Sequence, residues 1–116
     1  MNITAQDILY RRKFPRRGFK RSIGVLSGPR YKLCQGVEIG EGGLSFTGYS
    51  GYQVESKIVL NFQIPDGSFI SVHAEIKNIE ENRETRVNTY GCSFLNLSFE
   101  HKREIRSFVS ARSSKE

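Results

Sequence analysis

The chain has 116 residues, of which 37% are hydrophobic, and a formal net charge of +6; this size suits one domain with a modest core. No stretch approaches the roughly 20 apolar residues of a membrane helix, and residues 1–12 lack the apolar core of a signal peptide, so we expect a soluble, cytoplasmic protein. The two cysteines and the two histidines are widely separated in the sequence, which predicts neither a disulfide framework nor a metal site.

The positive charge is concentrated near the N-terminus. Residues 1–37 hold nine Lys or Arg and one acidic residue, Asp7, whereas residues 38–116 hold nine Lys or Arg and eleven acidic residues. A local excess of one sign indicates a site for a partner of the opposite sign. We therefore expect an anionic partner, with phosphate as the first candidate.

The first 18 residues contain the basic run Arg11–Arg17 and show no hydrophobic period. Pro15 and Gly18 both oppose a continuous helix, so residues 1–18 are predicted to form a flexible basic arm. Within it, Arg11, Arg12 and Arg16 place guanidinium groups close together in sequence. A guanidinium can grip a phosphate or the O6/N7 edge of guanine with two hydrogen bonds, and it can stack on a purine.

Residues 19–97 consist of short β-type runs separated by turn-forming residues, which predicts antiparallel hairpins. Two of the runs alternate clearly between apolar and polar positions. Their inner faces are expected to hold Ile58, Leu60, Phe62 and Ile64 from one strand and Ile70, Val72, Ala74 and Ile76 from the next, with His73 facing solvent. The six predicted strands are Phe19–Ser27, Tyr31–Ile39, Gly43–Phe46, Lys57–Ile64, Ser68–Ile79 and Thr85–Leu97.

The last part of the chain predicts one helix. Ser98 can cap a helix over about residues 98–111, and Ile105, Phe108 and Val109 follow the spacing of one apolar stripe. We expect this helix to pack on the strands, so that residues 19–112 form one domain. Residues 113–116 are expected to be a polar tail.

A glycine-rich segment, Val37–Phe46, joins the second and third predicted strands. Three glycines at positions 40, 42 and 43 surround Glu41. Glycine lets a ligand approach the backbone closely, although a plain hairpin turn would have the same composition. The combination of this turn with the arginine arm is more informative than either feature alone.

The arm and the turn together resemble the PilZ domain family, whose signature is an Arg-x-x-x-Arg arm followed by an Asp/Asn-x-Ser-x-x-Gly turn. Arg12 and Arg16 match the first motif, and Arg11 precedes it. In the second motif Gly43 matches, whereas Glu38 replaces Asp or Asn and Gly40 replaces Ser. The segment Tyr90–Ser98 and the helix after it also resemble the end of a PilZ domain.

The resemblance implies a mainly β fold: a six-stranded antiparallel β-barrel with a C-terminal helix. It also implies a non-enzymatic bacterial receptor that binds cyclic di-GMP as its ligand, needs no cofactor or metal, and presents a changed surface to a regulatory partner protein. The implied ligand-binding residues are Arg11, Arg12, Arg16, Glu38, Gly40 and Gly43, and no catalytic residue is implied.

Two other functions stay open from the sequence. The departures at Glu38 and Gly40 are compatible with a PilZ-like domain that binds no nucleotide and acts as a protein-interaction adaptor. A small basic barrel can also bind nucleic acid, with Phe14, Phe19 and Tyr31 as stacking groups, although the slightly acidic second half offers no continuing basic groove. No catalytic constellation can be assembled, and the sequence does not indicate an oligomeric state.

Overall fold

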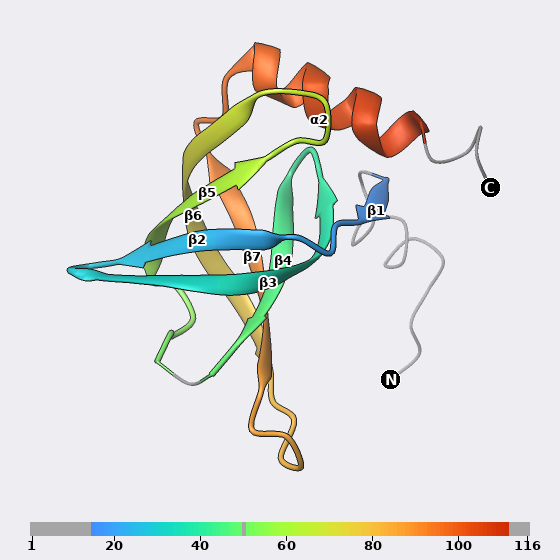
Figure 1. Cartoon of the computed structure of the whole chain (residues 1–116). Coiled ribbons are helices and arrows are strands. Elements are labelled where there is room, and N and C mark those ends of the chain that lie inside the picture. Colours follow the sequence, from blue (N-terminus) through green and yellow to red (C-terminus); the bar gives the residue numbers. More distant parts are fainter. Residues whose placement is uncertain (1–14, 50, 112–116) are drawn as a thin grey trace, which may run out of the picture.

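The computed structural model describes residues 15–49 and 51–111. In this part of the chain, seven β-strands precede one α-helix (Figure 1). The strands form one antiparallel sheet that curves around a hydrophobic core. The elements are β1 (Arg16–Gly18), β2 (Ser22–Ser27), β3 (Arg30–Gly40), β4 (Gly43–Gly48), β5 (Lys57–Gln63), β6 (Phe69–Glu80), β7 (Asn88–Leu95) and α2 (Phe99–Ala111).

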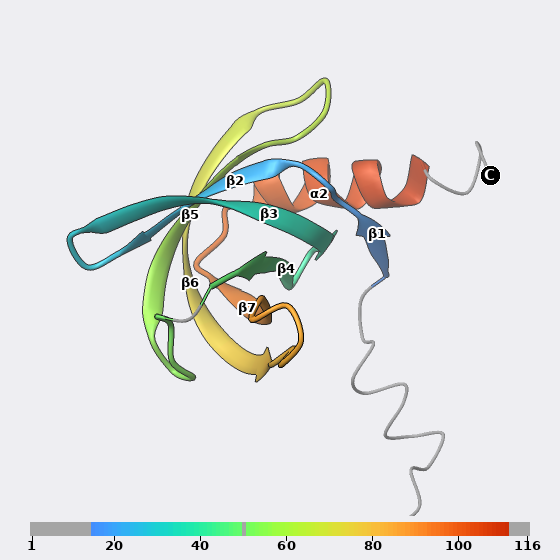
Figure 2. The same ribbon diagram turned by 60° about the horizontal axis from the view of Figure 1, so that its bottom comes forward.

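Six of the strands close into a barrel, as predicted. The order around the barrel is β3-β2-β5-β6-β7-β4, and β4 pairs back onto β3. Strand β3 makes this closure possible because it is long: its first half, residues 30–35, pairs with β2, and its second half, residues 35–39, pairs with β4. Figure 2 looks onto the barrel and shows β3 crossing from one partner to the other.

Strand β1 differs from the sequence prediction, which assigned residues 16–18 to the arm. These three residues pair with β3, with Arg16 opposite Gly40 and Gly18 opposite Glu38. They occupy the part of the β3 edge that β2 leaves free, because β2 pairs only as far as Gln35. The barrel sheet therefore includes residues before Phe19, and β1 lies beside the glycine-rich turn.

The core is formed by inward-facing side chains of the barrel and by one face of α2. The alternation predicted for β5 and β6 is confirmed, with Ile58, Leu60, Phe62, Ile70, Val72, Ala74 and Ile76 all buried. Phe19 is also buried and makes edge-to-face contacts with Phe62 and Phe108, with ring centroids 5.8 Å apart in both pairs. Phe19 thus joins the segment after β1 to the core and to α2.

The last predicted strand begins later than its sequence suggests. Thr85–Val87 belong to the loop between β6 and β7, not to β7. The side-chain oxygen of Asn82 accepts hydrogen bonds from the backbone N–H groups of Glu84 and Thr85, and Arg86 has a positive φ of 63°. These local bonds favour a turn over a strand. The resulting hairpin projects from the barrel at the bottom of Figure 1.

Helix α2 is confirmed within one residue of its predicted bounds. The Ser98 hydroxyl accepts a hydrogen bond from the His101 N–H at 3.1 Å, as expected of an N-cap. Ile105 and Val109 are buried, and Phe108 packs partly against the core, so the helix lies across one end of the barrel (Figure 1). In the part of the chain that the structure describes, no helix has the length and apolar character needed to cross a membrane.

Candidate functional site

A groove of about 680 Å³ lies on the outer surface of the barrel, where β1, β3, β4, β6 and β7 come together. Arg16, Glu38, Gly40 and Gly43, four of the six predicted ligand-binding residues, line it. The other two, Arg11 and Arg12, lie outside the described residues. The volume falls in the range of about 300–1,000 Å³ that is typical of small-ligand sites.

Arg16 and Glu38 face each other across the β1–β3 pair. The Nη1 atom of Arg16 lies 3.9 Å from Oε1 of Glu38, and both side chains are about half exposed. An ion pair this long and this accessible to water contributes little stability. The loss of this ion pair on ligand binding would therefore cost little.

A β-bulge sets the direction of Glu38. The register between β3 and β4 shifts between Gly36 and Glu38, so Val37 is the extra residue. Gly36 is required there because a Cβ atom on it would lie 2.5 Å from the carbonyl oxygen of Phe19. After the bulge Glu38 is exposed and Ile39 is buried, and the carboxylate projects into the groove.

Gly40 allows β1 to pack directly on β3. A Cβ atom at this position would lie 2.7 Å from the carbonyl oxygen of Pro15 and 3.3 Å from Cγ of Arg16. The first contact is with backbone, which cannot move aside as a flexible side chain can. The absence of a side chain at residue 40, where the PilZ motif has Ser, thus fits the seating of the arm against the groove.

Gly43 brings β4 close to β7. A Cβ atom there would lie 1.8 Å from the carbonyl oxygen of Cys92, so no larger residue fits without separating the strands. Cys92 itself also borders the groove, but burial raises the pKa of its thiol to about 12. The thiol therefore stays protonated at neutral pH, and we assign it a packing role.

Two contacts connect the rim of the groove to α2. Arg17, the residue after Arg16, donates a hydrogen bond from Nη1 to the Phe108 carbonyl oxygen at 2.8 Å. Glu41, in the turn between β3 and β4, accepts hydrogen bonds from Nε and Nη2 of Arg106 at 3.0 and 2.9 Å. These bonds hold the pKa of the Glu41 carboxyl below its ordinary value. Strand β1 and the β3–β4 turn, which border the groove at this end, are thus both tied to the helix.

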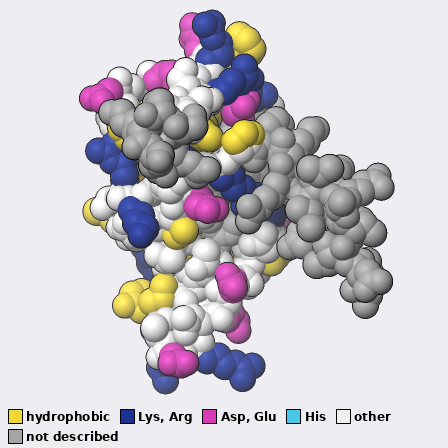
Figure 3. Space-filling model, turned by 90° about the vertical axis from the view of Figure 1, so that its right-hand side faces the viewer, with side chains coloured by type: hydrophobic (Ala, Val, Ile, Leu, Met, Phe, Trp, Pro, Cys, Tyr) yellow, Lys and Arg dark blue, Asp and Glu magenta, His cyan; other side chains and the backbone are white. Residues whose placement is uncertain are grey.

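Sequence reasoning missed the opposite wall of the groove, which β6 and β7 supply. Lys77, Asn78 and Glu80 of β6 lie there with Thr89, Gly91 and Ser93 of β7. Figure 3 views the side of the molecule on which β1 lies, where basic and acidic side chains are interspersed. The same mixture lines the groove, with Arg16 and Lys77 opposed by Glu38 and Glu80. A ligand that carries both phosphates and hydrogen-bond donors matches such a surface.

Phe19 and Tyr31, the two described residues among the three predicted nucleic-acid stacking groups, do not form a stacking surface together. Phe19 has only 1% of its surface exposed, so it cannot stack on a base, and this prediction is wrong. Tyr31 is 55% exposed, but it lies in the β2–β3 hairpin, where its ring lies over Gly24. Phe14 lies outside the described residues. Among the described residues, no group of three or more His, Cys, Asp or Glu side chains could hold a metal ion.

Three solved structures illustrate the shared fold. The Bacillus subtilis inhibitor of motility, MotI/DgrA, superposes with a TM-score of 0.81 at 11% identity, over 90% of this chain and 52% of that one. The PilZ domain of Escherichia coli YcgR, solved with c-di-GMP, has a TM-score of 0.71 at 11% identity, over 90% of this chain and 93% of that domain. The K. pneumonia MrkH–c-di-GMP complex has a TM-score of 0.70 at 14% identity, over 90% and 53%.

The chain spans about half the length of the MotI/DgrA and MrkH chains, and almost all of the YcgR domain. No curated protein sequence matches it. The family model of the PilZ domain, however, matches residues 10–111, which include the arginines of the arm, the complete barrel and α2. The chain therefore belongs to the PilZ domain family.

Proposed function

We propose that this PilZ domain is a cytoplasmic, non-catalytic receptor for cyclic di-GMP. The observation that carries the proposal is the convergence of Arg16 with Glu38, Gly40 and Gly43, a segment that begins 22 positions later in the sequence, on one groove of ligand size. The PilZ domain of YcgR and the similarly folded MrkH were solved with c-di-GMP. The nucleotide supplies phosphates that can bind the arginines, and guanine N–H groups that can donate hydrogen bonds to a carboxylate.

Each side of the groove has a defined task in this proposal. Arg12 and Arg16, helped by Arg11, bind phosphate and the O6/N7 edge of guanine with charge-assisted hydrogen bonds. Glu38 leaves Arg16 and accepts hydrogen bonds from a guanine N–H edge. The glycine turn brings the backbone close to the ligand. The arm closes around the nucleotide as these contacts form.

We expect a partner protein to recognise the ligand-bound state through helix α2. Arg17 follows a ligand-binding arginine and contacts Phe108, while Glu41 lies between two groove-lining glycines and contacts Arg106. A shift of either rim segment therefore changes a contact of α2. The exposed side of the helix carries Lys102, Arg103 and Arg106 together with Glu100, so a partner protein with a mainly acidic docking surface is the best match.

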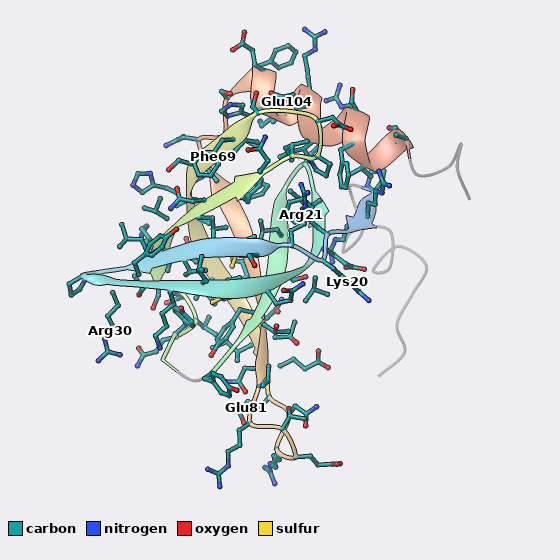
Figure 4. The ribbon with its side chains drawn as sticks, viewed as in Figure 1. Lys20, Arg21, Arg30, Phe69, Glu81 and Glu104 are labelled. Atoms are coloured by element: carbon teal, nitrogen blue, oxygen red, sulfur yellow. The ribbon has the colours of Figure 1, made fainter. Side chains whose placement is uncertain are left out.

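The test is calorimetric titration of the wild-type protein with cyclic di-GMP, with GTP and cyclic di-AMP as controls. Each charge-assisted contact is worth about 1.5–3 kcal/mol, so Arg12→Ala or Arg16→Ala should weaken binding by about 10- to 150-fold. The matched control is Arg30→Ala, because Arg30 lies at the far end of the β2–β3 hairpin, away from β1 (Figure 4). Equal affinities for Arg16→Ala and Arg30→Ala would refute the assignment of the arm.

A nucleotide-independent adaptor is the second candidate, and the packing at Gly40 favours it. A serine hydroxyl is missing there, and Pro15 and Arg16 already lie over the position. An adaptor would capture the same partner from a bacterial lysate with and without added cyclic di-GMP. Capture that depends on the nucleotide would exclude this candidate.

A further inference from the structure

We propose that Asn78 is a guanine-reading residue of this groove and that Lys77 beside it contacts a ligand phosphate. This inference rests on the proposed function, in which the arm and the glycine turn bind the ligand from one side of the groove. It adds binding residues on the opposite side, on β6. It follows from the path of β6, from the row of residues that crosses the groove, and from the hydrogen-bonding state of Asn78.

A β-bulge turns Asn78 to the outside of the barrel. The alternation in β6 buries Val72, Ala74 and Ile76, and its continuation would place Asn78 inside. The pairing with β7 instead shifts register between Ile76 and Asn78, so Lys77 is the extra residue. Lys77 and Asn78 are consequently both exposed, and Ile79 returns to the core. Bulges of this kind commonly redirect side chains next to functional sites.

Asn78 and Glu38 lie at opposite ends of one row across four strands. In the paired register, Asn78 is beside Gly91, Gly91 is beside Ser45, and Ser45 is beside Glu38. Neighbouring strands are about 4.8 Å apart, so the two ends are separated by about 14 Å along the sheet. Gly91 and Ser45 between them are small and leave a low floor on which a flat base can lie.

Gly91 also fixes where the Asn78 amide lies. A Cβ atom on Gly91 would be 2.6 Å from Oδ1 of Asn78 and 3.2 Å from its Nδ2, so the amide lies over β7 at the edge of the floor. Among the described residues, the Asn78 side chain makes no hydrogen bond. It therefore presents both an unused donor and an unused acceptor to the groove.

The chemistry of the two walls is complementary. A carboxylate such as Glu38 only accepts hydrogen bonds, whereas an amide both donates and accepts. The N2–H and N3 atoms of guanine form a donor and acceptor pair that an amide matches. Lys77 supplies the cation on this side, held 3.4 Å from Glu75 in the free protein. A cyclic dinucleotide has two bases and two phosphates, so it can engage both walls.

The experiment compares variants by calorimetric titration with cyclic di-GMP and with cyclic di-IMP, which lacks only the guanine amino groups. Asn78→Ala should lower the affinity for cyclic di-GMP by about 2- to 12-fold and reduce the preference over cyclic di-IMP. Lys77→Ala should weaken both ligands by about tenfold or more. The controls are Asn61→Ala and Lys57→Ala on β5, which do not line the groove. Lys57 is a matched control for Lys77 because both lysines are neighbours of Glu75: Lys57 lies opposite Glu75 in the β5–β6 pairing, and Lys77 forms an ion pair with it.

The possible results separate the two proposals. If wild type binds cyclic di-GMP and Asn78→Ala matches Asn61→Ala, the reading role of Asn78 is wrong while the receptor function stands. An equal loss for both ligands in Asn78→Ala would also overturn base reading at this residue. If wild type binds neither cyclic dinucleotide, the receptor function fails and the second wall fails with it.

Discussion

Arg17 lies with its guanidinium carbon 4.2 Å from the centre of the Phe108 ring and donates a hydrogen bond to the carbonyl oxygen of the same residue. Phe108 in turn contacts Phe19, whose ring belongs to the core. Phe108 of α2 therefore contacts both β1, through Arg17, and the barrel core, through Phe19. The residue just before Arg17 borders the groove, so this contact connects the groove to the helix, as the Glu41–Arg106 contact also does.

Replacing Arg17 by Ala should disconnect α2 from β1. Removal of the cation–π interaction and the hydrogen bond together predicts a free energy of unfolding lower by about 1–2 kcal/mol. Hydrogen exchange of α2 amides should become faster in the free protein, and cyclic di-GMP should change it less than in wild type. Exchange measured by mass spectrometry with and without the nucleotide tests both expectations.

Arg21→Ala is the matched control for this prediction. Arg21 also donates a guanidinium hydrogen bond to a backbone carbonyl, that of Gln63 at 3.3 Å, and among the described residues no hydrogen bond or ion pair joins it to α2. Its removal should leave the exchange of α2 unchanged. The connecting role of Arg17 would be contradicted if both variants altered α2 to the same degree.

Gly40→Ser restores the residue type of the PilZ motif and should nevertheless loosen β1. The new Cβ atom would meet the Pro15 carbonyl oxygen at 2.7 Å, so the start of β1 must move away from β3. We expect faster hydrogen exchange of the amides of residues 16–18. The affinity for cyclic di-GMP then shows whether the added hydroxyl outweighs the weaker β1–β3 pairing.

Gly18→Ser controls for the replacement of a glycine in β1 itself. A Cβ atom on Gly18 meets no other atom within 4 Å, so this variant should keep the β1–β3 pairing. If it loosened β1 as much as Gly40→Ser, the contact with Pro15 would not be the cause.

Gly43→Ala should destabilise the whole barrel, because the added methyl group would push against the backbone of Cys92 rather than against a movable side chain. Such overpacking typically lowers the free energy of unfolding by about 1–3 kcal/mol. Urea denaturation of Gly43→Ala and of the control Gly18→Ala measures this loss of unfolding free energy. Equal stability of the two variants would show that β4 and β7 can separate without penalty.

Local patterns were sufficient to predict most of the barrel. The period-two alternation of β5 and of β6 up to Ile76 determines which side chains face the core, and Ser98 with the apolar stripe of Ile105 and Val109 determines α2. These features depend on neighbours in the sequence, and the structure confirms each of them. The predicted members of the groove came from the family motif rather than from periodicity.

Features that depend on distant pairing could not be predicted. Strand β1 exists because a free stretch of the β3 edge is available to it, and its three residues, the last of which is Gly18, carry no strand signal of their own. The bulge at Lys77 reverses the expected direction of Asn78, since alternation alone would bury it. The contacts of Arg17 and Glu41 with α2 join residues 91 and 65 positions apart.

The Glu41–Arg106 contact predicts a pH dependence of stability. Its hydrogen bonds hold the pKa of Glu41 below the ordinary value of 4.5, so the folded protein binds this proton less readily than the unfolded chain does. The stabilisation is complete above that ordinary value and disappears as the pH falls through the lowered one. The melting temperature of wild type should therefore exceed that of Glu41→Gln at pH 7, and the difference should shrink in acid.

Glu81→Gln provides the reference for this comparison. Glu81 lies in the exposed loop between β6 and β7 (Figure 4) and makes no ion pair among the described residues. The Glu81→Gln variant loses the same charge as Glu41→Gln but keeps the Glu41–Arg106 contact, so its melting temperature should follow that of wild type across the pH range. A difference between wild type and Glu41→Gln that persisted unchanged in acid would mean that the Glu41 carboxylate does not hold the helix. Convergence would show that the β3–β4 turn is fastened to α2 through this charge, which is one of the two links through which we expect ligand binding to alter the helix.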